Sequence, residues 1–321
     1  MPRAISQNLQ RELVERTRAA EGQHRGASFS VAVCNLDGRP VAGVHQGSTH
    51  QAHSLAELNI ALAEQRLRRR ARAGLNREIT LQPSDRGDGG PLASQIGRRV
   101  MMREALAEAL VVSGETGSRA VTRAIGGPKA VNQALKSGLL VVSGLQPPEG
   151  SEHLSTKPDA PYLHGWTNAE ETATTFAALL REDGFAARAL TFGNGTSGIR
   201  REIDPVWGDN WRPAGSQHPA DVLMAELDQL IAIDPSGPEA TARLGRLLDP
   251  DWQPSAFPNK VAADNDRKIG ILSLHDVCQV GELVVASLVS LGFGEEPDFP
   301  LDNNHPAYNF HASVGELVAA A

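Results

Sequence analysis

The sequence has few of the residues that mark disulfide-bonded, metal-binding or nucleotide-binding proteins. Only two cysteines occur among 321 residues, Cys34 and Cys278, and both lie in strand-like runs where buried reduced thiols are the ordinary expectation. Ten scattered histidines, with no His-Glu-x-x-His motif and no cysteine pair at ligand spacing, give no support for a metal site. The glycines form no Walker or dinucleotide loop. The sequence therefore predicts neither a metal nor another cofactor.

Long apolar runs and dense charge are also scarce. No stretch is long and apolar enough to span a bilayer, and residues 1–10 lack the apolar core and cleavage site of a secretory signal. The net charge is −7, and the basic run at 68–72 is better explained as a solvated helix end than as a nucleic-acid site. We therefore expect a cytoplasmic protein that binds neither membranes nor nucleic acid.

Helices and strands follow a clear order along the chain. Residues 6–21 have apolar side chains at helical spacing, and residues 28–45 alternate apolar and polar side chains around Asp37-Gly38, which predicts a β-hairpin. Residues 268–274 and 283–289 predict two further strands. Between them, residues 54–250 are mainly helical in pattern, and 40% hydrophobic content is ample for a core.

Three short motifs stand out within this order. Ser54-Leu55-Ala56-Glu57 follows the hairpin and opens a helix. About sixty residues later, the helix predicted around 101–112 ends at Ser113-Gly114-Glu115, and Ile125-Gly126-Gly127-Pro128 leads into another helix. Lys260, in Asn259-Lys260-Val261-Ala262, precedes the predicted C-terminal strands. Together with the C-terminal helix predicted at 310–321, this arrangement resembles the class A β-lactamases and penicillin-binding proteins.

The resemblance implies an α/β fold with an antiparallel sheet, terminal helices that flank it and an inserted all-helical subdomain. Residues 1–53 and 251–321 would form the sheet part, and residues 54–250 the helical subdomain, with an unusual insertion at about 150–219. The candidate pocket would lie between the two parts, where it would bind a small-molecule substrate.

The resemblance also assigns residues to roles. Ser54 corresponds to the nucleophile, Ser113 to the proton-shuttling serine and Lys260 to the lysine of the strand that lines the cleft, while Glu149 corresponds by spacing alone to the loop glutamate that positions water. The motifs nevertheless depart from the family pattern. Ser-x-x-Lys has become Ser-x-x-Glu, Ser-Asp-Asn has become Ser-Gly-Glu, and Lys-Thr-Gly has become Lys-Val-Ala. Acyl transfer by the usual route is therefore not expected.

Several of these residues have two interpretations. Glu57 is either a base beside Ser54 or the second half of a capping box with it. Glu115 borders the same cleft as Glu57 if the fold holds, and two close carboxylates raise the pKa of one of them. Trp166, in a stretch rich in tryptophan and glycine, either frames a ligand pocket or fixes a long loop to the surface. For Glu149, a solvated loop position is the alternative.

Three functional hypotheses follow. The first is a repurposed enzyme that acts on an amino-acid-derived or peptide-like metabolite in specialised biosynthesis, with carboxylates for proton transfer, for example in an intramolecular ring closure that forms an azabicycle. The second is a serine hydrolase or amidase with Ser54 as nucleophile. The third is an inactive member that binds a protein partner or a second copy of itself.

Overall fold

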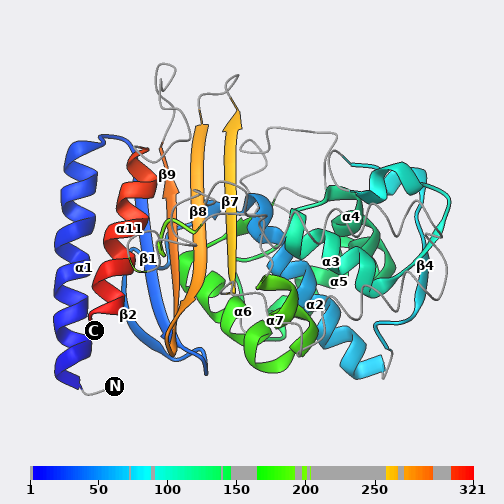
Figure 1. Cartoon of the computed structure of the whole chain (residues 1–321), viewed down its shortest axis with the longest axis horizontal. Coiled ribbons are helices and arrows are strands. Elements are labelled where there is room, and N and C mark those ends of the chain that lie inside the picture. Colours follow the sequence, from blue (N-terminus) through cyan, green and yellow to red (C-terminus); the bar gives the residue numbers. More distant parts are fainter. Residues whose placement is uncertain are drawn as a thin grey trace, which may run out of the picture.

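A five-stranded antiparallel sheet forms the centre of the computed structural model (Figure 1). The structure describes residues 3–71, 74–87, 91–138, 140–145, 165–191, 197–200, 203, 258–266, 271–291 and 305–321. In the sheet order β2-β1-β9-β8-β7, the strands are Pro40–Val44 (β2), Ser28–Asn35 (β1), Leu283–Ser290 (β9), Ile271–Val280 (β8) and Asn259–Asp266 (β7). β1 pairs with β9 along its whole length, so the two ends of the chain share one sheet, as predicted.

The predicted hairpin is present, and the two predicted C-terminal strands form a second one. The turn between β1 and β2 places Gly38 at φ +76°, where glycine is favoured, and the Asn35 side chain accepts hydrogen bonds from the backbone N–H groups of Asp37 and Arg39. Between β8 and β9, Gly281 has φ +59°. The two cysteines are buried and free, Cys34 on β1 and Cys278 on β8. Local turn residues therefore determine the sheet's connections.

Helices cover both faces of the sheet (Figure 1). The terminal helices α1 (Arg3–Gln23) and α11 (Pro306–Ala319) pack on one face, where Leu9, Leu13 and Val314 join the core and the rings of Phe29 and Phe310 lie 4.9 Å apart. On the other face lies α6 (Ala169–Glu182), which also contacts α2 (Ala56–Ala71). Alternate residues of β1 and β9 thus enter separate apolar clusters.

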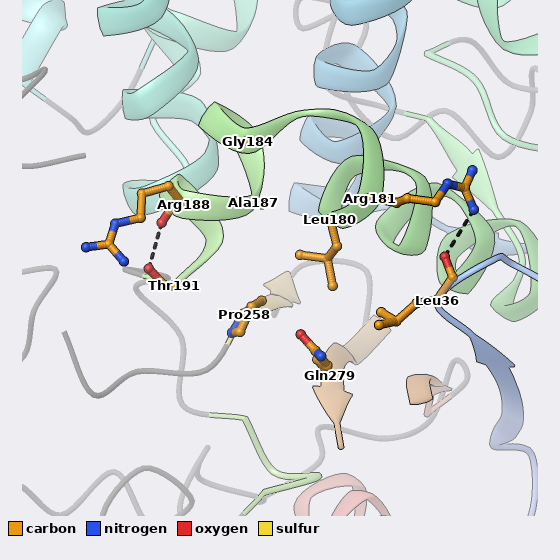
Figure 2. A pocket seen from close by; sticks show the side chains of 9 residues that line it. All are labelled: Leu36, Leu180, Arg181, Gly184, Ala187, Arg188, Thr191, Pro258 and Gln279. Carbon is orange, nitrogen blue, oxygen red and sulfur yellow. Dashed lines mark hydrogen bonds between the residues drawn. The ribbon is translucent and has the colours of Figure 1, made fainter. Parts of the chain in front are cut away.

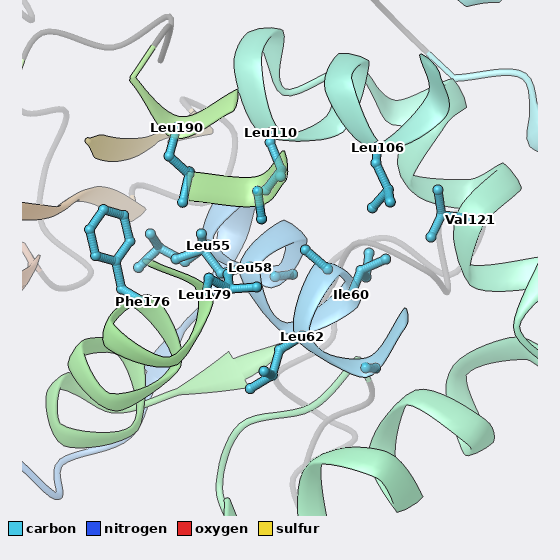
Figure 3. Packing of buried hydrophobic residues seen from close by; sticks show 14 of the residues in the cluster. Leu55, Leu58, Ile60, Leu62, Leu106, Leu110, Val121, Phe176, Leu179 and Leu190 are labelled. Atoms are coloured by element: carbon cyan, nitrogen blue, oxygen red, sulfur yellow. The ribbon is translucent and has the colours of Figure 1, made fainter. Parts of the chain in front are cut away.

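The helical part is organised around α2. In the described residues, the helical part contains, besides α2 and α6, the helices α3 (Met102–Val112), α4 (Glu115–Ala124), α5 (Gly127–Lys136) and α7 (Gly184–Leu190). Leu58 and Leu62 of α2 pack in one cluster with Leu110 and Phe176 (Figure 3). This cluster gives α2 a fixed position relative to the sheet.

Short strands interrupt the part that was predicted to be all-helical. β4 (Glu78–Thr80) pairs with β5 (Arg99–Met101), and β3 (His50–Gln51) pairs with β6 (Trp166–Thr167). Of the stretch predicted as an insertion at about 150–219, residues 165–191, 197–200 and 203 are described, and residues 165–191 include β6, α6 and α7. The remainder of the predicted helical part, residues 204–250, lies outside the described residues. No helix in the described ranges is long and apolar enough to cross a membrane.

A network of buried histidines and serines links β3 to the sheet. His50 Nε2 lies 2.8 Å from Ser30 Oγ and its Nδ1 lies 2.9 Å from Ser290 Oγ. The ring of His275 on β8 lies 5.5 Å from that of His50, and its Nε2 lies 2.8 Å from the carbonyl oxygen of Gln51. Burial lowers the pKa of His50 to about 4 and lowers that of His275 as well. Both rings are therefore neutral near pH 7.

The network predicts a loss of stability in mild acid. Unfolded histidine binds a proton below about pH 6.5, whereas folded His50 does so only near pH 4, so protons favour the unfolded chain between these values. Replacing His50 by glutamine removes this term. As the pH falls from about 6.5 to about 4, the free energy of unfolding of the His50→Gln variant should rise relative to that of the wild type by up to about 1.4 kcal/mol per pH unit. Urea unfolding measures this difference.

A non-titrating replacement provides the control. Gln65→Leu alters another buried polar side chain but removes no proton-binding group in this range, so its stability difference from the wild type should be the same at pH 7 and pH 5. A pH-independent difference for His50→Gln would contradict the prediction.

Candidate active site

The candidate site begins where the chain leaves β3. A single 3₁₀ turn (η1, His53–Leu55) precedes α2, and His53 has φ +46°, an uncommon conformation for a residue other than glycine. Ser54 is half-buried in this turn, and its hydroxyl has no hydrogen-bond partner in the described part of the chain. Glu57 follows in the first turn of α2 with only 2% exposure. The polar residues of the motif therefore lie at different depths.

The buried Glu57 carboxylate contacts the ammonium group of Lys260 on β7. Lys260 is 3% exposed, and its Nζ forms an ion pair with Glu57 Oε2. Glu57 Oε1 is the acceptor of a long, 3.4 Å hydrogen bond from Ser118 Oγ on α4. Two opposite charges are thus enclosed between the helical part and the sheet.

Lys260 also binds the end of α3. Its Nζ donates to the carbonyl oxygens of Ala109 at 2.9 Å and Leu110 at 3.1 Å, and to Ser113 Oγ at 2.9 Å. Carbonyl groups at a helix C-terminus are left without helical partners and favour a cation. Ser113 caps α3 in the left-handed region at φ 53°, and it is half-buried. Its hydroxyl therefore contacts the enclosed ammonium group although Ser113 itself is only partly buried.

The capping-box interpretation of Glu57 is wrong. The cap residue of η1 is Ala52, which makes no side-chain hydrogen bond, and the Glu57 carboxylate contacts Lys260 and Ser118 rather than the backbone N–H of Ser54. The 3₁₀ turn separates Ser54 from the start of α2 at Ala56, which removes the geometry that a capping box needs.

A second buried carboxylate comes from Glu108 on α3, which the sequence analysis missed. Its Oε1 accepts from the N–H of Leu92 at 2.7 Å and its Oε2 accepts from the N–H of Gly117 at 2.5 Å. The sequence feature that could have pointed to Glu108 is the pair of glycines at 114 and 117, since a Cβ atom at either position would overlap the Glu108 side chain. Such a tertiary contact has no fixed sequence spacing.

Glu115, predicted to border the cleft with Glu57, instead lies beside Arg119. Its carboxylate pairs with the Arg119 guanidinium at 2.9 Å, is 32% exposed, and packs against Gly87. The carboxyl group on which the charge of Glu57 acts is that of Glu108, whose pKa it raises.

Two further residues, Trp166 and Glu149, were predicted to bind the substrate, and the structure describes only the first of them. Trp166 belongs to β6, where its backbone pairs with Gly144 and its side chain is half-buried; it is part of a short sheet beside η1 rather than of a free loop. Glu149 lies outside the described residues. The structure thus brings together Glu57, Lys260 and Ser113, with Ser54 one helical turn before Glu57.

Burial dominates the electrostatics of the two carboxyl groups. It raises the pKa of Glu57 to about 7, although the Lys260 charge and hydrogen bonds from serine oppose this shift. It also raises the pKa of Glu108 to about 7, against the two backbone N–H donors and with a further contribution from the Glu57 charge. Both groups can exchange protons near neutral pH. Among the residues that the structure describes, no group of histidine, cysteine, aspartate and glutamate side chains could hold a metal ion.

A separate hollow of about 470 Å³ lies at another end of the sheet, between α6, α7 and the ends of β1 and β8 (Figure 2). Leu36, Leu180, Pro258 and Gln279 line it, and the Arg181 guanidinium donates to the Leu36 carbonyl oxygen at its rim. None of the predicted site residues contributes to this hollow.

Comparison with known proteins identifies the family of the chain. The model of the beta-lactamase enzyme family matches residues 12–191, more than half of the chain, so the chain belongs to that family. No curated protein matches it in sequence.

Three solved structures resemble the fold over nearly the full length of both chains. A beta-lactamase from Chitinophaga pinensis DSM 2588 has a TM-score of 0.63 at 11% identity, covering 96% of this chain and 98% of that one. A beta-lactamase from Sphaerobacter thermophilus DSM 20745 gives 0.59 at 14%, with 95% and 94% covered. A variant of the last common ancestor of Gram-negative class A β-lactamases, bound to 5(6)-nitrobenzotriazole, gives 0.58 at 18%, with 98% and 97% covered. The predicted class A β-lactamase-like α/β fold is therefore confirmed.

The buried ion pair predicts strongly coupled effects of substitution. Lys260→Met leaves the Glu57 carboxylate buried without its counter-charge, which typically costs about 3–5 kcal/mol of stability. Glu57→Gln in the same chain removes the stranded charge and should recover much of the loss, as measured by urea unfolding at pH 8.

The pH dependence separates loss of charge pairing from loss of packing. At pH 5 the Glu57 carboxyl is protonated in the Lys260→Met variant, so the variant should lose less stability there than at pH 8. Equal losses at both pH values, or additive effects in the double variant, would show that the ion pair does not govern stability here.

Proposed function

We propose that this member of the β-lactamase family is an enzyme that transfers protons at a small, amino-acid-derived or peptide-like substrate, and that it does not hydrolyse β-lactams. The observation that supports the proposal is the contact between Glu57 and Lys260, with Ser113 on the same ammonium group. A buried carboxyl group with a pKa of about 7 is suited to accept and return a proton.

Ser113 would connect the buried charges to the substrate. Its hydroxyl hydrogen-bonds the Glu57 carboxylate and accepts from Lys260, and it is more exposed than either. A substrate amine that binds at Ser113 would pass its proton to Glu57 through the serine hydroxyl. Lys260 would keep Ser113 in position and compensate the charge of Glu57 before the transfer.

Ring closure is a reaction that such a site suits. The amine nitrogen loses its proton to Glu57, forms a bond to an electrophilic carbon of the same molecule, and expels an anionic leaving group from that carbon. No acyl-enzyme and no additional oxidant or reductant is needed. A step of this type, such as azabicycle formation in specialised-metabolite biosynthesis, is the finer part of the proposal.

A serine hydrolase or amidase is the second candidate, and the state of Ser54 favours it. The hydroxyl is half-buried and has no partner in the described ranges, at the position where the family has its nucleophile. Glu57 would have to serve as its base, yet its carboxylate is engaged with Lys260 and Ser118. We therefore rank this candidate below proton transfer.

A binding protein without catalytic activity is the third candidate. Glu57 and Lys260 neutralise each other and are almost inaccessible, as expected for a site that is filled by its own side chains. The partner would be another protein or a second copy of the chain.

Substitutions at three positions distinguish the candidates. The assay substrate is the metabolite made by the enzymes that neighbouring genes encode. With this substrate, Glu57→Gln should lower kcat at least about 100-fold, because the proton acceptor is lost. Ser113→Ala should lower it strongly as well, whereas Ser54→Ala should change it only a few-fold. The wild-type rate should rise with pH through about 7, because Glu57 must be ionised to accept a proton.

Covalent probes and a surface control complete the test. A fluorophosphonate or penicillin adduct that is lost in Ser54→Ala would contradict proton transfer and support the hydrolase. Unchanged activity in Glu57→Gln would also contradict the proposal. Glu115→Gln changes a partly exposed carboxylate that pairs with Arg119, so it should retain activity.

A further inference from the structure

The turn that carries Ser113 differs from the family motif in a way that the structure explains. Gly114 stands where Ser-Asp-Asn has its aspartate. Gly114 has φ −71° and ψ 118°, a conformation open to any residue, so the backbone does not require glycine. The close packing of Glu108 does require glycine, since a Cβ atom at position 114 would lie 2.3 Å from Cγ and 2.5 Å from Cδ of Glu108. The side chain of Glu108 therefore occupies the room that a residue at 114 would fill.

We propose that Glu108 supplies the carboxylate that the turn has lost at position 114, as a positioning residue that fixes Ser113 and couples electrostatically to Glu57. The electrostatic part rests on the proposed function of Glu57 and Ser113, whereas the positioning part rests on contacts alone.

The contacts of Glu108 hold three segments together. Its Oε1 binds the N–H of Leu92 in the 3₁₀ helix η3 (Pro91–Gln95), and its Oε2 binds the N–H of Gly117 in the first turn of α4. Its carbonyl oxygen accepts from the N–H of Gly114 at 3.1 Å. Ser113 lies between these attachments, and its left-handed conformation depends on both ends of the turn being held.

The same carboxyl group lies close enough to Glu57 for their charges to interact. Glu108 binds Gly117, and the next residue, Ser118, donates to Glu57. The groups that face Glu108 are the N–H donors from η3 and α4 and the carboxylate of Glu57 from α2. Lys260 of β7 pairs with Glu57 and binds the carbonyl oxygens of Ala109 and Leu110, the two residues that follow Glu108. When Glu57 accepts a proton, its charge disappears and ionisation of Glu108 becomes easier. The pair thus retains negative charge beside Lys260 during the transfer.

Titration of the two carboxyl groups tests this coupling without any substrate. In ¹³C NMR titrations of the full chain with labelled glutamate, Glu108→Gln should lower the apparent pKa of Glu57 by about one unit, because a nearby negative charge is removed. Glu57→Gln should lower that of Glu108 by a similar amount. Glu104→Gln is the matched control: Glu104 lies one turn earlier on α3, and its carboxylate binds the N–H of Met101 instead.

The outcomes separate this inference from the proposed function. If Glu57 titrates at the same pH in folded Glu108→Gln as in the wild type, the coupling does not exist, whatever the activity. If Glu108→Gln does not fold, the reciprocal titration of Glu108 in Glu57→Gln decides the question. A shift of equal size in Glu104→Gln would show a general loss of structure and would overturn the inference. If the coupling is observed while Glu57→Gln remains active, only the proposed function fails.

Moving the carboxylate back to the turn tests the positioning part. Gly114→Asp should lower Tm markedly, because the new side chain overlaps Glu108. Gly114→Asp combined with Glu108→Ala should recover most of that loss, since aspartate then has room and is also a favourable N-cap residue for α4. The control double variant, Gly114→Asp with Glu104→Ala, should show no recovery of Tm. If Gly114→Asp alone keeps the wild-type Tm, or if Glu108→Ala does not restore the Tm of Gly114→Asp, then Glu108 does not take the place of a carboxylate at position 114.

Discussion

The contact between Glu57 and Lys260 is the constraint on which the rest of the candidate site depends. Each group is almost completely buried, and an isolated charge in such a place would cost several kcal/mol. The pair is tolerated because Lys260 also binds the carbonyl groups that α3 leaves without helical partners. One ammonium group therefore fixes α2, α3 and β7 relative to one another, and it determines where Ser113 lies.

The sequence was sufficient to predict features that depend on local patterns. The β1–β2 hairpin follows from Asp37-Gly38, and the resemblance to the class A β-lactamases implied that Lys260 lies on the strand that lines the cleft. The direction of the Glu57 side chain was not predictable, because the choice between a capping box and an ion pair depends on a one-turn 3₁₀ segment and on a strand some two hundred residues away. Sequence spacing carries no information on such a contact.

Glu108 and the buried histidines were missed for a related reason. Glu108 is one of two glutamates on α3, and only its packing against Gly114 and Gly117 distinguishes it from Glu104. The pairing of His50 with Ser30 and Ser290 likewise forms only after the sheet is assembled. Polar groups inside a core are satisfied by tertiary neighbours, so their partners appear in no short motif.

The exchange of lysine for glutamate at position 57 also changes which substrates the site can favour. A lysine there would leave two ammonium groups in one buried space and would attract an anionic substrate. Glu57 instead cancels the charge of Lys260, and Glu108 adds a second carboxyl group nearby. The enclosed groups then carry no net positive charge, and they carry negative charge when both carboxyl groups are ionised. Such a site has no reason to prefer an anion, which is consistent with the proposed transfer of a proton from a substrate amine to a carboxylate base.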